Sequence, residues 1–369
     1  MMGLFRHHSR QRPDGRYIDP AVGKLAGEGA LQAVREVEPA SKNGRLIEQP
    51  PADTDSAFGY YGVPALKDPV WKWYIPTYFY VGGLAGASGV LGAAADLLGR
   101  EELKPLVRRC RLVAVGGALA SSALLIADLG RPERFLYMLR VVRPSSPMNM
   151  GTWILTAFGT SSGLAALPSL IPVGARTERA SDAAALLAGL IGLPLTGYTG
   201  VLMANTAVPL WQGARHSLPI LFSASGAASA ASLLEMFPAG RAYPVTHRFA
   251  LASKAAELGM TFVLEREAAA VRRVASPLRS GFSGGLWRAG QGLSLAGLVL
   301  TAFGGRRGAR LAGVLGTAGA LALRFALLFG GRRSARDSRA TFEQQRARAR
   351  LNGETSPRVS PSVPAPPAP

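Results

Sequence analysis

Long uncharged stretches fill the middle of this chain and constrain its fold more than any other feature. Six stretches contain no Asp, Glu, Lys or Arg, and they cover residues 73–95, 112–127, 144–175, 183–214, 216–234 and 289–305. A helix needs roughly 20 apolar residues to cross the hydrocarbon of a bilayer. Because lipid offers the backbone no hydrogen-bond partners, apolar runs of this length are expected to cross as helices. The pattern predicts six membrane-spanning helices.

Two further apolar runs carry charges. They cover residues 249–265 and 309–330. The charged residues that matter in them are Lys254, Glu257, Glu265 and Arg324. Charged side chains inside a membrane nearly always face the protein interior, so both runs can span if their charges are buried in the bundle. With them, the sequence predicts an all-α polytopic membrane bundle of about eight transmembrane helices.

The two ends of the chain differ from this middle part. Residues 1–70 mix charges, proline and glycine without the apolar core of a signal peptide, and we expect an irregular, soluble polar segment. Residues 331–369 pass from an arginine-rich stretch into a proline-rich one, a composition typical of disorder. We therefore predict a transmembrane domain over residues 71–330, followed by a disordered basic and proline-rich tail.

The distribution of Lys and Arg predicts on which side of the membrane the two termini lie. An even number of spans leaves both termini on one side, and Lys and Arg near the spans are more numerous on that side. Positive charge favours the cytoplasmic side, so both termini are predicted to be cytoplasmic.

Composition excludes several classes of function. The net charge of +19 is distributed between the apolar runs and in the tails, without the basic and aromatic patch of a nucleic-acid-binding protein. Contact of these Lys and Arg residues with lipid headgroups explains the positive charge better than nucleic-acid binding does. Cys110 is the only cysteine, and the four histidines lie in the N-terminal segment or beside loops. We therefore expect no metal, iron-sulfur cluster or haem in this chain.

The segment from Asp128 to Trp153 is the best clue to function. It reads DLGRPERFLYMLRVVRPSSPMNMGTW and lies between two apolar runs. Ionisable groups where a span meets water are candidates for function. The alternative is a solvated loop whose arginines contact lipid headgroups.

Four sequence pieces together resemble one family. They are WKWYIPTYFYVGGLAGASGVL from Trp71, DLGRPERF from Asp128, SPMNMGTWIL from Ser146 and GYTGVLMANTAVPLW from Gly197. Their combination, across roughly residues 70–330, resembles the NrfD family, the membrane subunits of polysulfide reductases and related molybdopterin oxidoreductases.

This resemblance implies a subunit that does not itself act on the primary substrate. Such a chain anchors an iron-sulfur subunit and a molybdopterin catalytic subunit in a bacterial-type cytoplasmic (inner) membrane. It exchanges electrons with the quinone pool, so its expected cofactor is menaquinone or ubiquinone. Its expected partners are those two subunits and membrane lipid.

The resemblance also indicates quinone-binding residues. Tyr198 matches the YTG motif and can donate a hydrogen bond to a quinone carbonyl; alternatively, its hydroxyl bonds a neighbouring helix. Asp128 could relay protons or bond the quinone headgroup, or it could form a helix-end ion pair that fixes the loop. Arg131 and Arg134 are expected to fix the loop or to face a partner.

The first span departs from the family pattern. Members can carry an Asn and a His there, whereas this chain offers Trp73, Tyr74, Thr77, Tyr78 and Tyr80. We assign Tyr78 and Trp73 to the quinone site. A tyrosine could replace the donor, the quinone could bind differently, or the subunit could only anchor. Trp73 could also be an ordinary residue of the membrane-interface aromatic belt.

Charged residues within the spans are candidates for an internal proton path. Lys254 and Glu257 lie one helical turn apart and could pair with each other. Glu235 and Arg324 are similar candidates, and Arg324 could be the counter-ion of either glutamate. The alternative for each is a structural ion pair.

Three functions follow from these observations. The first is a quinone-reactive membrane subunit of a multi-subunit oxidoreductase. The second is a passive membrane anchor without a working quinone site, and the third is an ion-coupled transporter that uses the buried charges.

Overall fold

The computed structural model describes residues 17–18, 25–26, 66–67, 69 and 71–351. The chain divides into two units, Met1–Tyr60 and Tyr61–Pro369. In the first, β1 (Tyr17–Ile18) and β2 (Leu25–Ala26) pair in antiparallel fashion. The rest of the irregular segment predicted for residues 1–70 lies almost entirely outside the described residues.

In its described part, the second unit is all-α. Its long helices are α1 (Tyr74–Leu97), α2 (Lys104–Leu129), α4 (Pro147–Leu170), α5 (Ala175–Ala204), α7 (Ser217–Glu235), α8 (Tyr243–Ala268), α10 (Gly281–Phe303) and α11 (Gly305–Arg336). Its shorter elements are η2 (Glu101–Leu103), α3 (Glu133–Met138), α6 (Pro209–Gly213), η3 (Gly240–Ala242), α9 (Arg272–Arg279) and α12 (Ser338–Leu351). The predicted all-α bundle is confirmed.

Each apolar run of the sequence contains most of one long helix, and the run 183–214 also contains the short helix α6. Five of these helices are long and apolar enough to cross a membrane, namely α1, α2 together with η2, α5, α7 and α11. Glycine, serine and threonine lower the hydropathy of α4 and α10, and charged residues lower that of α8. The chain is a multi-pass membrane protein, and the number of eight spans stays a prediction.

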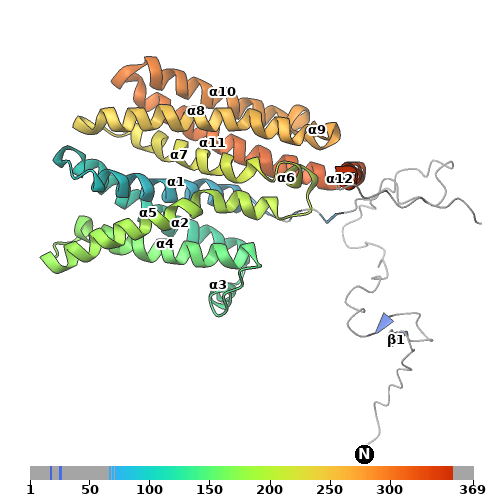
Figure 1. The fold of residues 1–369 in the computed structure, drawn as a ribbon, viewed down its shortest axis with the longest axis horizontal. Helices are drawn as coiled ribbons and strands as arrows, with labels where there is room; N and C mark the ends of the chain where they lie inside the picture. The colour runs from blue at the N-terminus through green and yellow to red at the C-terminus, as the bar shows by residue number, and fades with distance from the viewer. Residues whose placement is uncertain (1–16, 19–24, 27–65, 68, 70, 352–369) are drawn as a thin grey trace, which may run out of the picture. The chain divides into compact units, whose positions relative to one another are not determined.

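The long helices form two groups of four. In Figure 1, α1, α2, α4 and α5 lie together on one side of the bundle, and α7, α8, α10 and α11 lie on the other. The groups meet where α1 and α5 contact α7 and where α1 contacts α11. Accordingly, 83% of the most apolar 18-residue segment of α1 is buried inside the protein, against 28% of the corresponding segment of the span that contains α2. The first span is therefore the central helix, although its mean hydropathy of 1.2 is lower than the 1.9 of the more exposed span that contains α2.

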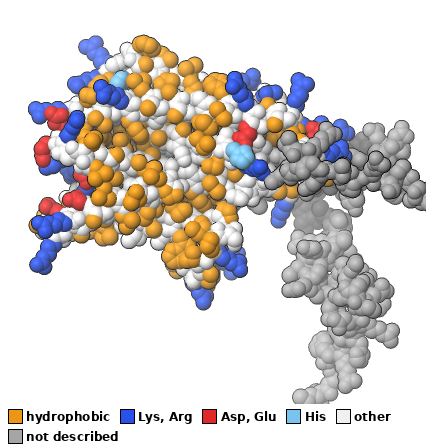
Figure 2. All heavy atoms as spheres, viewed as in Figure 1, with side chains coloured by type: hydrophobic (Ala, Val, Ile, Leu, Met, Phe, Trp, Pro, Cys, Tyr) orange, Lys and Arg blue, Asp and Glu red, His pale blue; other side chains and the backbone are white. Residues whose placement is uncertain are grey.

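The surface of the bundle matches a membrane. Figure 2 shows hydrophobic side chains over its middle, with Lys and Arg gathered toward the ends. Large apolar side chains such as Leu119, Leu190 and Phe262 are more than half exposed on the long helices. Water would not favour such a band, whereas lipid does.

Local sequence explains where the key helices begin and end. Pro147 is in the first turn of α4, and the Ser146 hydroxyl accepts a hydrogen bond from the Asn149 amide (3.4 Å). Proline and a serine cap are both favourable at a helix start. Helix α2 ends at Gly130, whose φ of 70° is the left-handed conformation that glycine adopts readily. The motif DLGRP therefore marks the end of α2, and the motif SPMN marks the start of α4.

The predicted boundary at residue 330 is wrong. Helix α11 continues to Arg336, and α12 follows up to Leu351. Arg332 donates to the carbonyl oxygens of Pro69 and Trp71, and Arg333 donates to that of Ser280 (2.6 Å). Composition suggested disorder because these arginines count as charge, but here they bond to backbone carbonyls and hold the helix against the bundle. The part of the predicted tail beyond residue 351 lies outside the described residues.

Candidate functional site

Tyr198 is held between two motifs. It lies on α5, and its side chain is 8% exposed. A Cβ atom at Gly151, in the SPMNMGTW motif of α4, would overlap the Tyr198 ring. The absence of a side chain at Gly151 therefore leaves room for the Tyr198 ring. The SPMNMGTW motif of α4 and the YTG motif of α5 pack directly against each other.

The Tyr198 ring borders a cavity of about 520 Å³ between α4, α5 and α7. Apolar side chains line much of it, including Met150, Ile154 and Leu193. The polar groups on its wall belong to Tyr198, Ser145, Asn205 and Ser223. Cavities of 300–1,000 Å³ with apolar walls and a few polar groups are typical of small-molecule sites.

The Tyr198 hydroxyl has no hydrogen-bond partner in the described part of the chain, so the alternative of a bond to a neighbouring helix is not realised there. Of the other polar side chains on the wall, Ser223 and Asn205 form hydrogen bonds, whereas none is described for the Ser145 hydroxyl. Ser223 donates to the carbonyl of Pro219 (3.0 Å), and Asn205 donates to that of Val201 (3.0 Å). The Tyr198 and Ser145 hydroxyls and one N–H of the Asn205 amide are therefore free donors at the cavity in the described part of the chain.

One asparagine organises the loop beside the cavity. The Asn149 side chain accepts from the Arg143 amide (2.7 Å) and donates to the Met138 carbonyl (2.5 Å). It thereby fixes the segment between α3 and α4, which contributes Pro144 and Ser145 to the cavity wall. This role was not predicted, although Asn149 lies within a quoted motif; Ser223 had no signal in the sequence.

The other proposed quinone residues are placed differently. Tyr78 is buried on α1 and lies close enough to Tyr198 to interact electrostatically, but it does not line the cavity. Trp73 is 57% exposed and packs against Tyr74, with ring centroids 4.3 Å apart. Asp128 is half-buried at the end of α2, where it interacts with Lys72. Tyr78 and Tyr198 are thus brought together, whereas Trp73 and Asp128 do not line the cavity.

The two loop arginines are exposed. Arg134 donates to the Leu129 carbonyl at the end of α2 (3.3 Å), and Arg131 lies beside it in the turn. Whether either arginine faces a partner stays a prediction.

Trp211 of the PLW motif anchors the far end of α11. Its indole donates to the Leu327 carbonyl (2.9 Å), and a Cβ at Gly331 would overlap its ring. Trp71 stacks on it, with centroids 5.2 Å apart and planes 13° from parallel. The PLW motif therefore has a packing role that joins the start of the first span to the last long helix.

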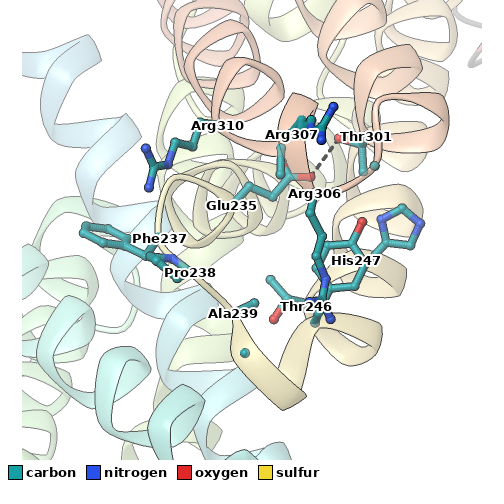
Figure 3. A pocket seen from close by; sticks show the side chains of 14 residues that line it. Glu235, Phe237, Pro238, Ala239, Thr246, His247, Thr301, Arg306, Arg307 and Arg310 are labelled. Carbon is teal, nitrogen blue, oxygen red and sulfur yellow. Dashed lines mark hydrogen bonds between the residues drawn. The ribbon is translucent and has the colours of Figure 1, made fainter.

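The buried charges lie on α7, α8 and α11. Lys254 donates to Glu235 (2.5 Å), to the Thr301 hydroxyl (2.9 Å) and to the Ala312 carbonyl (3.1 Å). Thr301 in turn donates to Glu235 (2.8 Å), the bond drawn in Figure 3. All three donors of the Lys254 ammonium group are used, and both carboxylate oxygens of Glu235 accept a hydrogen bond. The buried ion pair therefore has its hydrogen-bonding groups satisfied inside the bundle.

Lys254 is therefore paired with Glu235, and the direct pair with Glu257 that the spacing allowed is not formed. The two residues are neighbours on one helix, but the Lys254 side chain reaches α7 instead. Glu257 accepts from Ser225 (2.5 Å) and Ser294 (3.2 Å). Ser225 accepts from Arg324 (2.6 Å), so a serine joins the arginine to this glutamate.

The polar groups continue along α8. Lys254, Glu257, Thr261 and Glu265 follow at spacings that share one helix face. Glu265 accepts from Trp287 (2.5 Å) and Gln291 (2.8 Å), and Gln291 also donates to Thr261 (3.1 Å). Trp287 and Gln291 were not predicted because each looks like an ordinary residue of an apolar run. The row places titratable groups over several turns of one helix, and its use as a proton path stays a prediction.

The NrfD_2 family model, described as polysulfide reductase, matches residues 57–337. No curated protein is similar enough to the chain to be matched. The match spans all the long helices from α1 to α11, including the four motifs that carry the resemblance. The chain belongs to the polysulfide reductase NrfD family and is a multi-pass membrane subunit of an oxidoreductase complex.

Proposed function

We propose that this chain is the quinone-reactive subunit of its complex. In this proposal it anchors an iron-sulfur subunit and a molybdopterin catalytic subunit in the cytoplasmic membrane, and it exchanges electrons with menaquinone or ubiquinone. The observation that carries the proposal is the free Tyr198 hydroxyl at a cavity of about 520 Å³ with largely apolar walls.

The residues present fit a quinone ring. Met150, Ile154 and Leu193 offer an apolar wall, and Tyr198 offers a hydrogen-bond donor. A quinone, when bound, supplies a carrier that takes up two electrons and two protons. The chain's own part is to hold the ring and to donate a hydrogen bond to one carbonyl. Because Gly151 lets α4 approach the tyrosine closely, that donor is held in a fixed position.

Substitution of Tyr198 by phenylalanine tests this role. In the intact complex, Tyr198→Phe should lower quinone-linked turnover by about tenfold, the effect of one lost hydrogen bond of about 1.4 kcal/mol. Electron transfer to an artificial dye should stay unchanged. Tyr137→Phe is the matched control, because Tyr137 is 59% exposed on α3. Unchanged quinone kinetics in Tyr198→Phe would remove this residue from the site.

Asp128→Asn tests the second assigned residue. Because Asp128 does not line the cavity, any role in quinone turnover must act over some distance. We expect quinone turnover to fall more than dye reduction. Equal loss with both acceptors would instead show that the carboxylate fixes the end of α2.

The partners can be identified directly. The tagged chain should be purified in mild detergent, its companions identified by mass spectrometry, and its lipid fraction extracted for quinones. Iron-sulfur and molybdopterin subunits with quinone would support the proposal. The same subunits without quinone would favour a passive anchor, and a lone chain without quinone would favour a transporter.

We also propose that both termini are cytoplasmic. Cys110 is the only cysteine and is buried, so single cysteines can be introduced at exposed positions after its replacement by alanine. Gly99 and Gly130 lie beyond opposite ends of α2. In intact cells, a membrane-impermeant maleimide should label a cysteine at position 99 and not one at position 130; the reverse pattern would invert the topology.

A further inference from the structure

A second cavity, of about 500 Å³, lies at the end of the bundle where α7 and α10 finish and α8 and α11 begin. Three arginines from the start of α11 line it, together with His247 and Tyr243 from α8. In Figure 3, Arg306 and Arg310 extend to different sides of Glu235. We call this cavity the arginine pocket.

None of the three pocket arginines is paired with a carboxylate in the described part of the chain. Arg306, Arg307 and Arg310 are exposed, and no described acidic group lies within salt-bridge distance of them. Glu235 is the acidic residue that lines the pocket with them. However, Lys254 and Thr301 already bond both of its carboxylate oxygens. The pocket therefore presents three guanidinium groups and little compensating negative charge.

The position of these arginines is electrostatically unfavourable without an anion. They occupy the first turns of α11, where the helix dipole is positive and where acidic residues are normally preferred. The first turn of α11 contains no acidic residue, and neither does that of α8. Neither helix start has a side-chain cap in the described chain. An anion in the pocket would face both the arginines and these uncapped amides.

Apolar and aromatic side chains form one side of the pocket. Phe237 and Pro238 form part of its wall. Arg306 lies over the Tyr243 ring at 5.0 Å, and Tyr243 stacks on His247 with centroids 5.3 Å apart. These contacts restrain Arg306 before a ligand binds, so less side-chain freedom is lost on binding.

We propose that the arginine pocket binds a phosphate-bearing anion. Two sources share this chemistry: the headgroup of an anionic membrane phospholipid and free inorganic phosphate. Guanidinium groups suit phosphate because their planar N–H donors can bond two oxygens at once. The apolar wall beside them would accommodate the first part of a lipid chain. This site is separate from the Tyr198 cavity and does not depend on the proposed quinone chemistry.

The test compares two variants of the purified full-length chain in detergent. In the first, Arg306→Gln and Arg310→Gln are combined. The second is Arg266→Gln, an exposed arginine without a described acidic partner at the other end of α8. Phosphatidylglycerol is titrated by native mass spectrometry, and inorganic phosphate is titrated by thermal shift against chloride at equal ionic strength.

We expect wild type and Arg266→Gln to bind one of the two probes, and the double variant to bind it at least about tenfold more weakly. Saturable binding of phosphatidylglycerol that excess phosphate does not displace would identify a lipid site. A thermal shift with phosphate alone would identify a free-anion site. Equal affinity of wild type and double variant for both probes, or no saturable binding of either by wild type, would overturn the proposal. If the double variant does not fold, Arg306→Gln and Arg310→Gln are titrated singly, and affinities equal to that of Arg266→Gln in both would overturn the proposal.

Discussion

The two halves of the bundle are held together by different interactions between helices. In lipid, helices gain no hydrophobic energy from packing on each other, so association depends on close contact and on polar bonds. The half formed by α1, α2, α4 and α5 relies on glycine contacts, as where a Cβ at Gly86 would lie 2.8 Å from the Gly192 carbonyl oxygen. The half formed by α7, α8, α10 and α11 also has glycine contacts, such as Gly297 against Gly316.

Only this second half adds buried charge. The fully buried charged residues of the described chain are Glu235, Lys254, Glu257 and Arg324, and all lie on α7, α8 or α11. The first half has a charged clamp of Arg111 with Asp96 and Asp182, but Asp182 is exposed and Asp96 partly so. One half is therefore held together mainly by close packing, and the other also by polar bonds that leave a buried charge unpaired if one partner is removed.

The largest effect should come from breaking the buried pair. Lys254→Met would leave Glu235 buried without its cation, and we expect it to destabilise the chain by about 3–5 kcal/mol. Thermal unfolding in detergent measures this loss. Combining Lys254→Met with Glu235→Gln should restore much of it, because no uncompensated charge then remains. A single variant as stable as wild type would show that the second half does not depend on its charges.

A smaller effect is expected in the glycine-packed half. Gly86→Ala would place a methyl group against the α5 backbone, which must shift, and we expect a loss of about 1–3 kcal/mol. Gly116→Ala is the matched control, because nothing lies within 4 Å of a Cβ there. The control should be neutral or slightly stabilising, by up to about 1 kcal/mol. Equal stability of both variants would contradict shape-based packing.

The smallest effect concerns the contact between the halves. The Tyr80 hydroxyl of α1 donates to Thr317 of α11 (3.3 Å). Tyr80→Phe removes this bond, and interhelical hydrogen bonds in membranes average about 0.6 kcal/mol. A loss of that order by thermal unfolding would indicate that packing joins the halves. A loss several times larger would mean that this bond is central to the interface.

Much of the fold was predictable from the chain because span formation is local. Each long uncharged run forms most of one long helix, and the motif residues Gly130, Ser146 and Pro147 lie at helix ends for reasons visible in the sequence. The end of α11 was mispredicted because composition cannot show that Arg332 and Arg333 find backbone carbonyls.

The candidate site was predictable only in part. Tyr198 was identified from its motif, but its free hydroxyl and its contact with Gly151 depend on how α4 and α5 cross. Trp73 was assigned to the same site, yet it is 57% exposed because it precedes the first turn of α1. A motif indicates which residues matter, whereas helix rotation decides which of them face each other.

Apolar length and motif spacing are properties of the amino-acid sequence, and they are enough to identify a helical membrane protein of the NrfD family. The tertiary structure alone decided that Lys254 pairs with Glu235, that a serine stands between Arg324 and Glu257, and that three arginines share one pocket. The physical reason is that a charge buried in a bundle bonds to whatever its helix is turned toward, and that orientation is set by the packing of all the helices together.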